Sequence, residues 1–155
     1  MSQIIAILNF EEGYVESPYL DTQGFPAVAG GIRIGPQGAS LSNYHFLMPR
    51  LVGDTWKLCI LESKLQEMKK YDLISQALKK CNRARSDVLY SMACQPGIEN
   101  LAQFKEMLKL IAQEDFHGAA KAMFDSAWAQ NNKGRARRHA EVMRTGNYDI
   151  YRGLI

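Results

Sequence analysis

The spacing of apolar residues changes near residue 54, and this change most constrains the fold. From there on, apolar side chains recur at the helical positions 58, 61, 65 and 68, so a long helix is expected over about 54–69. Before this point, residues 21–38 hold five of the 12 glycines and two of the five prolines, with the alternation typical of short strands. The chain is therefore expected to combine a small hairpin sheet with a mainly helical remainder.

Shorter helical patterns lie on both sides of this helix. They predict helices over 3–12, 71–80, 85–94, 101–113, 117–124 and 134–143, and a short helix over 40–48 that Pro49 ends. We expect one α+β domain of two lobes, with a helix and sheet lobe over about 1–53, a connecting helix over about 54–69 and a helical lobe over about 70–155. A functional site is expected in the cleft between the lobes.

The composition is that of an ordinary globular protein. The 155 residues fit a single domain, and 46% hydrophobic with 23% charged residues are common values for such a chain. No run approaches the ~18 apolar residues of a membrane-spanning helix, and the N-terminus lacks the basic segment of a signal peptide. The three cysteines have no metal-type spacing and are expected to be reduced thiols buried in helices. We therefore expect synthesis in the cytoplasm without a classical signal peptide.

Two acidic residues occupy positions that suit chemistry on a sugar. Glu12 ends the first apolar helix directly before Gly13, and Asp21 follows nine residues later in a glycine-rich hairpin. At the last turn of a helix the dipole disfavours negative charge, which helps to keep a proton on the first carboxyl. The second carboxyl can fix a β-turn and also face a substrate. Glycoside hydrolysis needs such a pair, one protonated and one ionised.

The segments around these carboxyls belong to a series of motifs that runs along the chain. They are Phe10-Glu11-Glu12-Gly13, Tyr19-Leu20-Asp21-Thr22-Gln23-Gly24-Phe25, Gln95-Pro96-Gly97, Ser126-Ala127-Trp128, Arg135-Ala136-Arg137-Arg138 and Arg144-Thr145-Gly146-Asn147-Tyr148-Asp149. In this order and spacing they resemble the phage-type lysozyme (endolysin) family, most closely the lysozymes of T-even phages. The resemblance covers nearly the whole chain and is patchier in the middle.

This resemblance implies a lysozyme fold and a muramidase activity. The substrate would be peptidoglycan, cut between N-acetylmuramic acid and N-acetylglucosamine by acid-assisted displacement by water with inversion. By the same resemblance, Glu12 is the general acid. Asp21 is the carboxylate that stabilises positive charge developing at the sugar ring or helps to activate water.

Other residues are expected to bind the substrate. Gln95 and Arg135 match family positions that line the cleft, where a glutamine can bind an acetamido group and an arginine can fix a carboxyl. Gly31 and Phe25 are also expected to contact the glycan. The rings of Tyr19 and Phe25 flank the aspartate, and they could stack on sugar faces or pack against the sheet.

The sequence departs from the family pattern at two positions close to Asp21. Where the family has a threonine that is thought to hold the attacking water, this chain has Ala27, and where the family has a histidine it has Ile32. Alanine has no hydroxyl and cannot position water. Three explanations are open: another group such as Thr22, Ser17 or His45 positions the water, a different bond is cut, or glycan is bound without cleavage.

The charge distribution and the spacing of the histidines limit which partners and ligands can be expected. The net charge of +3 is uneven, because residues 133–144 carry five basic side chains and one acidic side chain. Such a segment suits an anionic polymer, and it is also a common solvated helix face. The three histidines share no spacing that would hold zinc, so we expect no metal and no cofactor. Peptidoglycan strands are the expected partner of a monomer, with no nucleic acid.

Three functions of different classes follow. The first is a lysozyme, acting as an endolysin, a tail-borne lysozyme or a cell-wall effector that reaches the wall or periplasm after release or delivery. The second is a catalytically impaired module that binds cell-wall glycan or a protein partner. The third uses the basic C-terminal helix to disrupt membranes or bind nucleic acid, which would give binding that weakens steeply with salt.

Overall fold

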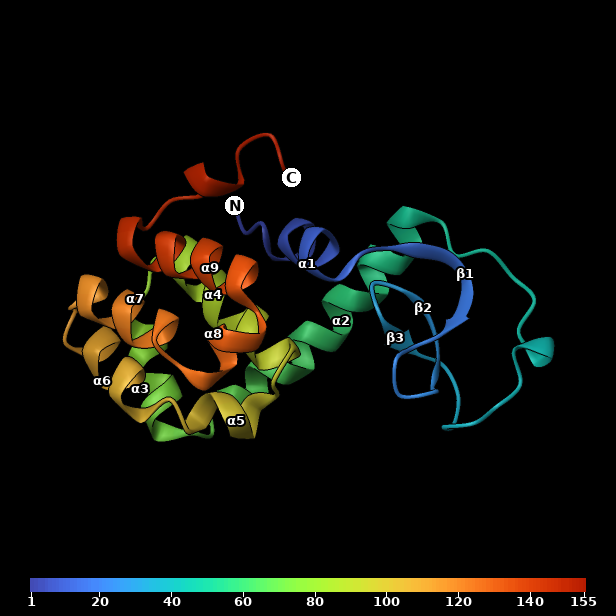
Figure 1. Ribbon diagram of the computed structural model, residues 1–155, viewed down its shortest axis with the longest axis horizontal. Helices are drawn as coiled ribbons and strands as arrows, with labels where there is room; N and C mark the ends of the chain where they lie inside the picture. Colours follow the sequence, from blue (N-terminus) through green and yellow to red (C-terminus); the bar gives the residue numbers. More distant parts are fainter. The chain divides into compact units, whose positions relative to one another are not determined.

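The computed structural model describes residues 1–155 and has the α+β composition expected from the sequence. A three-stranded antiparallel sheet lies near the N-terminus, and the remainder is mainly helical (Figure 1). The chain divides into two compact units. We call Ile5–Glu62 the sheet unit, and Met1–Ile4 with Ser63–Ile155 the helical unit.

The sheet unit begins with a helix and continues into the sheet. Its elements are α1 (Ile4–Glu12), β1 (Val15–Leu20), β2 (Pro26–Ala29) and β3 (Ile32–Arg33), paired in the order β1-β2-β3 (Figure 1). Val28 lies opposite Ile32, and both are buried in an apolar cluster that includes Met48 and Ile60. This packing fixes the register, because a shift by one residue would turn these side chains to the other face.

The other face of the sheet carries the residues of functional interest. Tyr19 is paired with Ala27, and Ala27 is paired with Arg33. Directly opposed residues of antiparallel strands point to the same face, and they alternate with the apolar residues of the cluster. Tyr19, Ala27 and Arg33 therefore form one row across the three strands.

The long helix begins earlier than the sequence pattern predicts. α2 spans Arg50–Met68, and its first turn starts at Pro49, whose carbonyl accepts from the Gly53 N–H at 3.0 Å. Asp54, expected near the start of this helix, instead accepts from Asn9 Nδ2 at 2.9 Å. A proline before the first turn needs no N–H partner, which is why the helix can start there.

The short helix expected over 40–48 is limited to one turn. The 3₁₀-helix η1 (Leu41–Asn43) follows Ser40, whose Oγ accepts from the Ser42 N–H. The chain then becomes extended, and the Met48 N–H donates to the carbonyl of Glu16 in β1 at 2.7 Å. A backbone bond to β1 therefore replaces the second helical turn.

The helical unit consists of short helices with clear caps. They are α3 (Asp72–Lys80), α4 (Arg83–Cys94), α5 (Ile98–Ala102), α6 (Lys105–Ala112), α7 (Phe116–Phe124), α8 (Ala127–Asn131), α9 (Lys133–Thr145) and the 3₁₀-helix η2 (Asp149–Tyr151). Side chains of Asn82, Asp115 and Ser126 accept from N–H groups of the first turns of α4, α7 and α8. Gly146 ends α9 with a φ of 76°, in the left-handed region.

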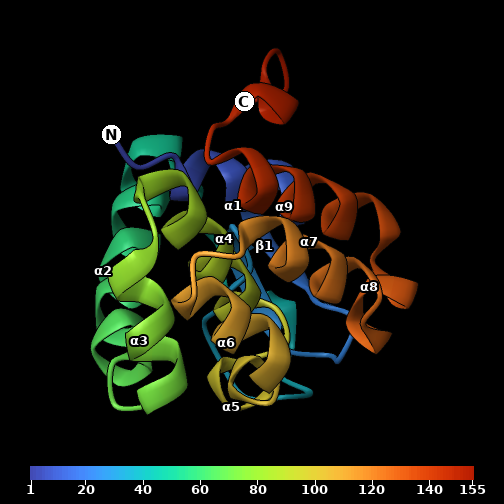
Figure 2. The same cartoon turned by 90° about the vertical axis from the view of Figure 1, so that its left-hand side faces the viewer.

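The core of this unit lies among α4, α6, α7 and α9. Figure 2 shows α9 lying along α7, and both contribute fully buried side chains. Large side chains without exposed surface include Leu89, Met92, Leu108, Ile111 and Met123. No helix, including the 19-residue α2, combines the length and the apolarity that crossing a bilayer requires.

Two helical features differ from the sequence-based expectation. The single helix expected over 101–113 is two helices, α5 and α6, because Phe104 leaves the helical conformation and sets its ring edge-on against Trp128, with ring centroids 6.4 Å apart. α8 was not expected, since five residues are too short to show a helical period.

The cysteines are free thiols, as expected, but they are not uniformly buried helical residues. Cys59 is exposed on α2, and Cys81 lies just after α3. Burial raises the pKa of Cys81 to about 12, against the opposing charge of Arg85. The expectation of buried thiols was wrong for Cys59, because its position on α2 faces solvent.

A buried carboxylate is predicted to be the most sensitive point of the helical unit. Asp87, on α4, has no exposed surface and accepts from Ser2 Oγ at 2.7 Å, Gln3 N at 2.8 Å and Tyr148 Oη at 2.5 Å. Asp87→Asn replaces one acceptor oxygen by a donor, so it should lower the free energy of unfolding by roughly 2–3 kcal/mol in urea titrations. Asp149→Asn removes only an exposed ion pair with Arg152, so it should change the free energy of unfolding by less than about 0.5 kcal/mol. Equal effects of the two variants would contradict this.

Candidate active site

Glu12 lies at the end of α1, where the sequence places it, and a lysine from another helix contacts it. Gly13 ends the helix with a φ of 83°. Lys57 Nζ of α2 lies 3.6 Å from Glu12 Oε2 and donates to the Gly30 carbonyl at 2.9 Å. The Lys57 side chain is only 13% exposed. This ammonium group therefore ties α1, α2 and the β2–β3 turn together and restricts the orientation of Glu12.

The β2–β3 turn fits against α1 only with glycine at position 30. A Cβ at Gly30 would lie 3.1 Å from Asn9 Oδ1. Asn9 is itself held, because its Nδ2 donates to Asp54 Oδ1 at 2.9 Å. The close approach of the turn to α1 brings the Gly30 carbonyl within reach of Lys57.

Asp21 sits in the turn after β1, and its carboxylate accepts three hydrogen bonds. Oδ1 accepts from the backbone N–H groups of Gln23 at 2.9 Å and Phe25 at 3.0 Å, and Oδ2 accepts from Arg33 Nε at 2.9 Å. The bond from the Phe25 N–H, followed by those from Arg33 and Gln23, holds the pKa of Asp21 below its ordinary value. The turn role and the ionised state expected for this residue thus have the same origin.

Arg33 also covers the ring that was expected to stack on sugar. Its guanidinium carbon lies 3.9 Å from the centroid of Phe25, and its Nη2 donates to Gln23 Oε1 at 3.0 Å. One face of the Phe25 ring is therefore already occupied by a cation. Sugar stacking by Phe25 stays a prediction, and it would have to use the other face or displace Arg33.

Tyr19 lies on β1, one residue before Leu20 and two before Asp21. Burial, then the charge of Asp21, then that of Glu12 raise the pKa of the Tyr19 hydroxyl. The same hydroxyl lies 4.0 Å from the place of a Cβ on Gly31, which is exposed and has a φ of 82°. Glu12, Asp21, Gly31 and Phe25 all belong to the sheet unit, and their roles stay predictions.

The two departures from the family pattern are both buried. Ala27 has no exposed surface, and Ile32 is 4% exposed within the apolar cluster of the sheet. The side chain at position 27 therefore does not reach water in this structure. The three substitutes considered from the sequence, Thr22, Ser17 and His45, are all exposed.

Gln95 and Arg135, the other expected substrate-binding residues, belong to the helical unit. Gln95 is exposed; its Oε1 accepts from Trp128 Nε1 at 3.1 Å, and its Nε2 donates to Asn132 Oδ1 at 2.6 Å. Arg135 is 7% exposed and donates to Ser91 Oγ at 2.7 Å. Their substrate-binding roles stay predictions.

A buried series of hydrogen-bonded side chains lies next to Arg135, and no sequence pattern indicated it. His139 Nε2 lies 2.7 Å from Ser91 Oγ, and its Nδ1 lies 3.0 Å from Tyr151 Oη. Burial, with the charges of Arg135 and Arg138, holds the pKa of His139 well below its ordinary value. A serine paired with a histidine can form a nucleophile, but none of Ser91, His139 and Tyr151 has exposed surface. These three hydrogen-bonded side chains therefore have a structural role.

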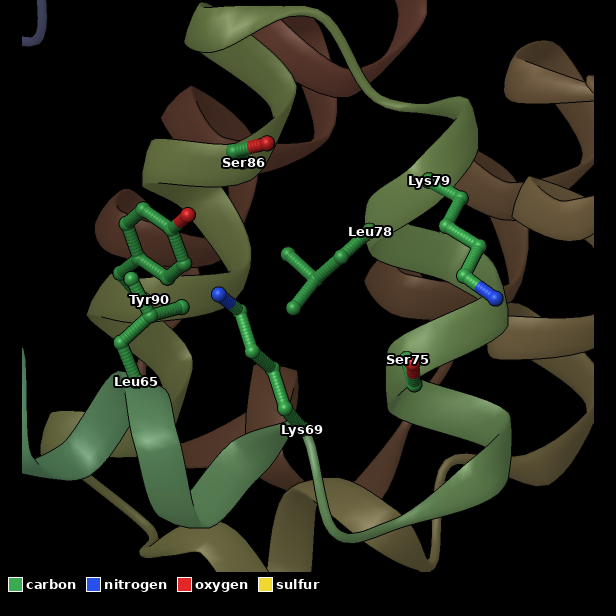
Figure 3. Close-up of a pocket in the computed structure, with 7 residues that line it drawn as sticks. All are labelled: Leu65, Lys69, Ser75, Leu78, Lys79, Ser86 and Tyr90. Carbon is green, nitrogen blue, oxygen red and sulfur yellow. The ribbon is translucent and has the colours of Figure 1, made fainter.

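The helical unit also contains a hollow of about 340 Å³ between α2, α3 and α4. Its lining is Leu65, Lys69, Ser75, Leu78, Lys79, Ser86 and Tyr90, and Figure 3 shows the Lys69 side chain reaching between Leu78 and Tyr90. The lining contains no carboxyl group, so the hollow lacks the acid that glycoside hydrolysis requires. The residues around Tyr19 are the better candidate.

Side chains of the metal-binding types are dispersed. The structure contains no group of three His, Cys, Asp or Glu residues placed to hold a metal ion, and its cysteines form no disulfide.

The small antiparallel sheet and the mainly helical remainder are consistent with a lysozyme-like α+β fold. No family model matches the chain. It is 29% identical over 94% of its length to the "Pre-baseplate central spike protein Gp5" of Enterobacteria phage T4, of which it spans 28%, and 25% identical over 98% of its length to the "Probable T4-type lysozyme 1" of Dictyostelium discoideum, of which it covers 99%. These similarities support a T4 lysozyme-like family and confirm the resemblance to phage-type lysozymes.

Removing the arginine next to Asp21 should change the titration of that carboxyl. In Arg33→Met the pKa of Asp21 should rise toward the ordinary value of about 3.9, without reaching it because the two backbone donors remain. NMR titration of the carboxyl carbon measures this. Arg50→Met is a matched control, since Arg50 lies against Asp54 instead. An unchanged pKa in Arg33→Met would mean that the Arg33–Asp21 bond is not formed in solution.

The same variant should change how stability depends on pH. The folded-state pKa of Asp21 is lowered, so its ionised form stabilises the fold above the unfolded-state value of about 3.9, and this contribution is lost as pH falls through the folded-state pKa. Wild type should therefore exceed Arg33→Met in stability at neutral pH, and the difference should shrink below about pH 4. Urea titrations at several pH values test this, and a pH-independent difference would argue against the carboxylate.

Proposed function

We propose that this protein is a peptidoglycan-degrading lysozyme that hydrolyses the bond between N-acetylmuramic acid and N-acetylglucosamine. The observation that carries the proposal is the Asp21 carboxylate, held ionised by three donors in the same unit as Glu12 at the end of α1. An ionised carboxylate beside a second carboxyl is the arrangement that glycoside hydrolysis uses. The similarity to a protein named as a T4-type lysozyme supports the same activity.

The two carboxyls would divide the work. Glu12, at the negative end of the α1 dipole, donates a proton to the leaving glycosidic oxygen. Asp21 stays ionised and faces the positive charge that develops at the sugar ring. Its low pKa makes it a weak base, so its main contribution is electrostatic.

Four residues are the candidates for binding the glycan. Gly31 is exposed beside the Tyr19 hydroxyl and lets a sugar approach the backbone closely. The amide of Gln95 is exposed next to Trp128 and can bind an acetamido group. Arg135 and Phe25 are the further candidates for substrate contacts. We expect a monomer that reaches peptidoglycan after release or delivery.

A glycan-binding module without hydrolysis is the second candidate. Two observations favour it: position 27 offers no hydroxyl and no access to water, and both oxygens of Asp21 already accept hydrogen bonds. Such a module would bind peptidoglycan and leave it intact. The two candidates therefore differ in whether the glycan chain is cut.

Digestion of purified peptidoglycan decides between them. Wild type should release fragments with muramic acid at the reducing end, detected by mass spectrometry. Glu12→Gln should reduce the rate at least about a hundredfold, the low end of what a positioned general acid contributes. Glu16→Gln, an exposed carboxyl on β1, is the matched control and should retain the wild-type rate.

Two other results would change the assignment. Full activity in Glu12→Gln would remove Glu12 from the mechanism. If wild type releases no fragments and still sediments together with the peptidoglycan, the protein is a binding module.

A further inference from the structure

The candidate site has no obvious group to hold the attacking water, because Ala27 occupies the position of the family threonine. Ala27 is paired with Tyr19 on one side and with Arg33 on the other, so the three side chains share one face of the sheet. Ala27 itself has no exposed surface. A group that holds water must therefore come from one of its two neighbours in this row or from outside the sheet.

The two neighbours differ in what they can offer a water molecule. Arg33 carries only donors, and its Nε and Nη2 are engaged by Asp21 and Gln23. The Tyr19 hydroxyl both donates and accepts, and it lies beside the exposed Gly31. A phenol also places its hydroxyl several ångströms farther from the backbone than threonine does. It can therefore extend past the buried methyl group of Ala27.

We propose that the Tyr19 hydroxyl holds the water that attacks the sugar, replacing the hydroxyl that is missing at Ala27. This inference rests on the proposed hydrolysis. The water oxygen forms a bond to the anomeric carbon while the glycosidic carbon–oxygen bond breaks. Glu12 gives its proton to the leaving oxygen, and the attacking water loses a proton to solvent once its bond to carbon has formed, while Asp21 stays ionised and faces the positive charge at the ring.

The protonation state of Tyr19 fits this role. Burial and the charges of Asp21 and Glu12 raise its pKa, so the phenol stays neutral at neutral pH and keeps its O–H. The row across the sheet places Tyr19 on the same face as Arg33, which holds the Asp21 carboxylate, and the proposed water lies between the hydroxyl and this carboxylate. Tyr19 acts on the reacting water, while Arg33 positions Asp21.

Tyr19→Phe tests the proposal, because it keeps the ring and removes only the hydroxyl. We expect kcat to fall at least tenfold and KM to stay within twofold, with an unchanged melting temperature. Tyr44→Phe is the matched control: this hydroxyl of the same unit packs against Gly35, and its loss should leave kcat unchanged. Peptidoglycan binding by Glu12→Gln should also be unaffected when Tyr19→Phe is added, since the hydroxyl holds water and not glycan.

Ala27→Thr is the opposing variant. If Tyr19 holds the water, a threonine at a buried position should lower the melting temperature without raising kcat. A large gain in kcat, or wild-type kcat in Tyr19→Phe, would overturn the inference.

Results for Glu12→Gln separate this inference from the proposed function. Hydrolysis that Glu12→Gln abolishes and Tyr19→Phe leaves intact would reject only the role of Tyr19. No hydrolysis by wild type would reject both.

Discussion

The three hydrogen bonds accepted by the Asp21 carboxylate are the constraint on which the candidate site depends. Two come from its own turn, at Gln23 and Phe25, and one comes from Arg33 on β3, so a single side chain shapes the β1–β2 turn and joins it to the far strand. All three donors favour the ionised form. The interaction that fixes the turn therefore also fixes the charge presented to a substrate.

The departures from the family pattern make sense as parts of the sheet core. Ile32 packs with Val28 and Ile60 on one face, and Ala27 is fully covered on the other. Neither position is open to water, so a hydroxyl or an imidazole there would be buried and would need a partner. The polar contacts of the two carboxyls come from elsewhere: Lys57 lies 3.6 Å from Glu12, and Arg33 donates to Asp21.

The sequence predicted most of the helices and the place of Glu12 at the end of α1 because these depend on local patterns. Apolar spacing reveals helices, and a glycine after Glu12 marks the end of α1. Contacts between distant segments leave no such pattern. In the sequence Lys57 is only one charged residue of a helix. In the structure it contacts Glu12, which is 45 residues away, and Gly30, which is 27 residues away. The burial of His139 and the split at Phe104 likewise depend on tertiary partners.

The anomeric configuration of the first product tests the account most directly. A water held beside Asp21 and Tyr19 attacks the anomeric carbon in one displacement, so a β-linked glycan should give the α anomer. Proton NMR in the first minutes of digestion, before the anomers interconvert, distinguishes the two forms. The account predicts the α anomer, which Glu12→Gln should not produce. An initial β anomer would contradict it, because retention requires a second displacement at the same carbon.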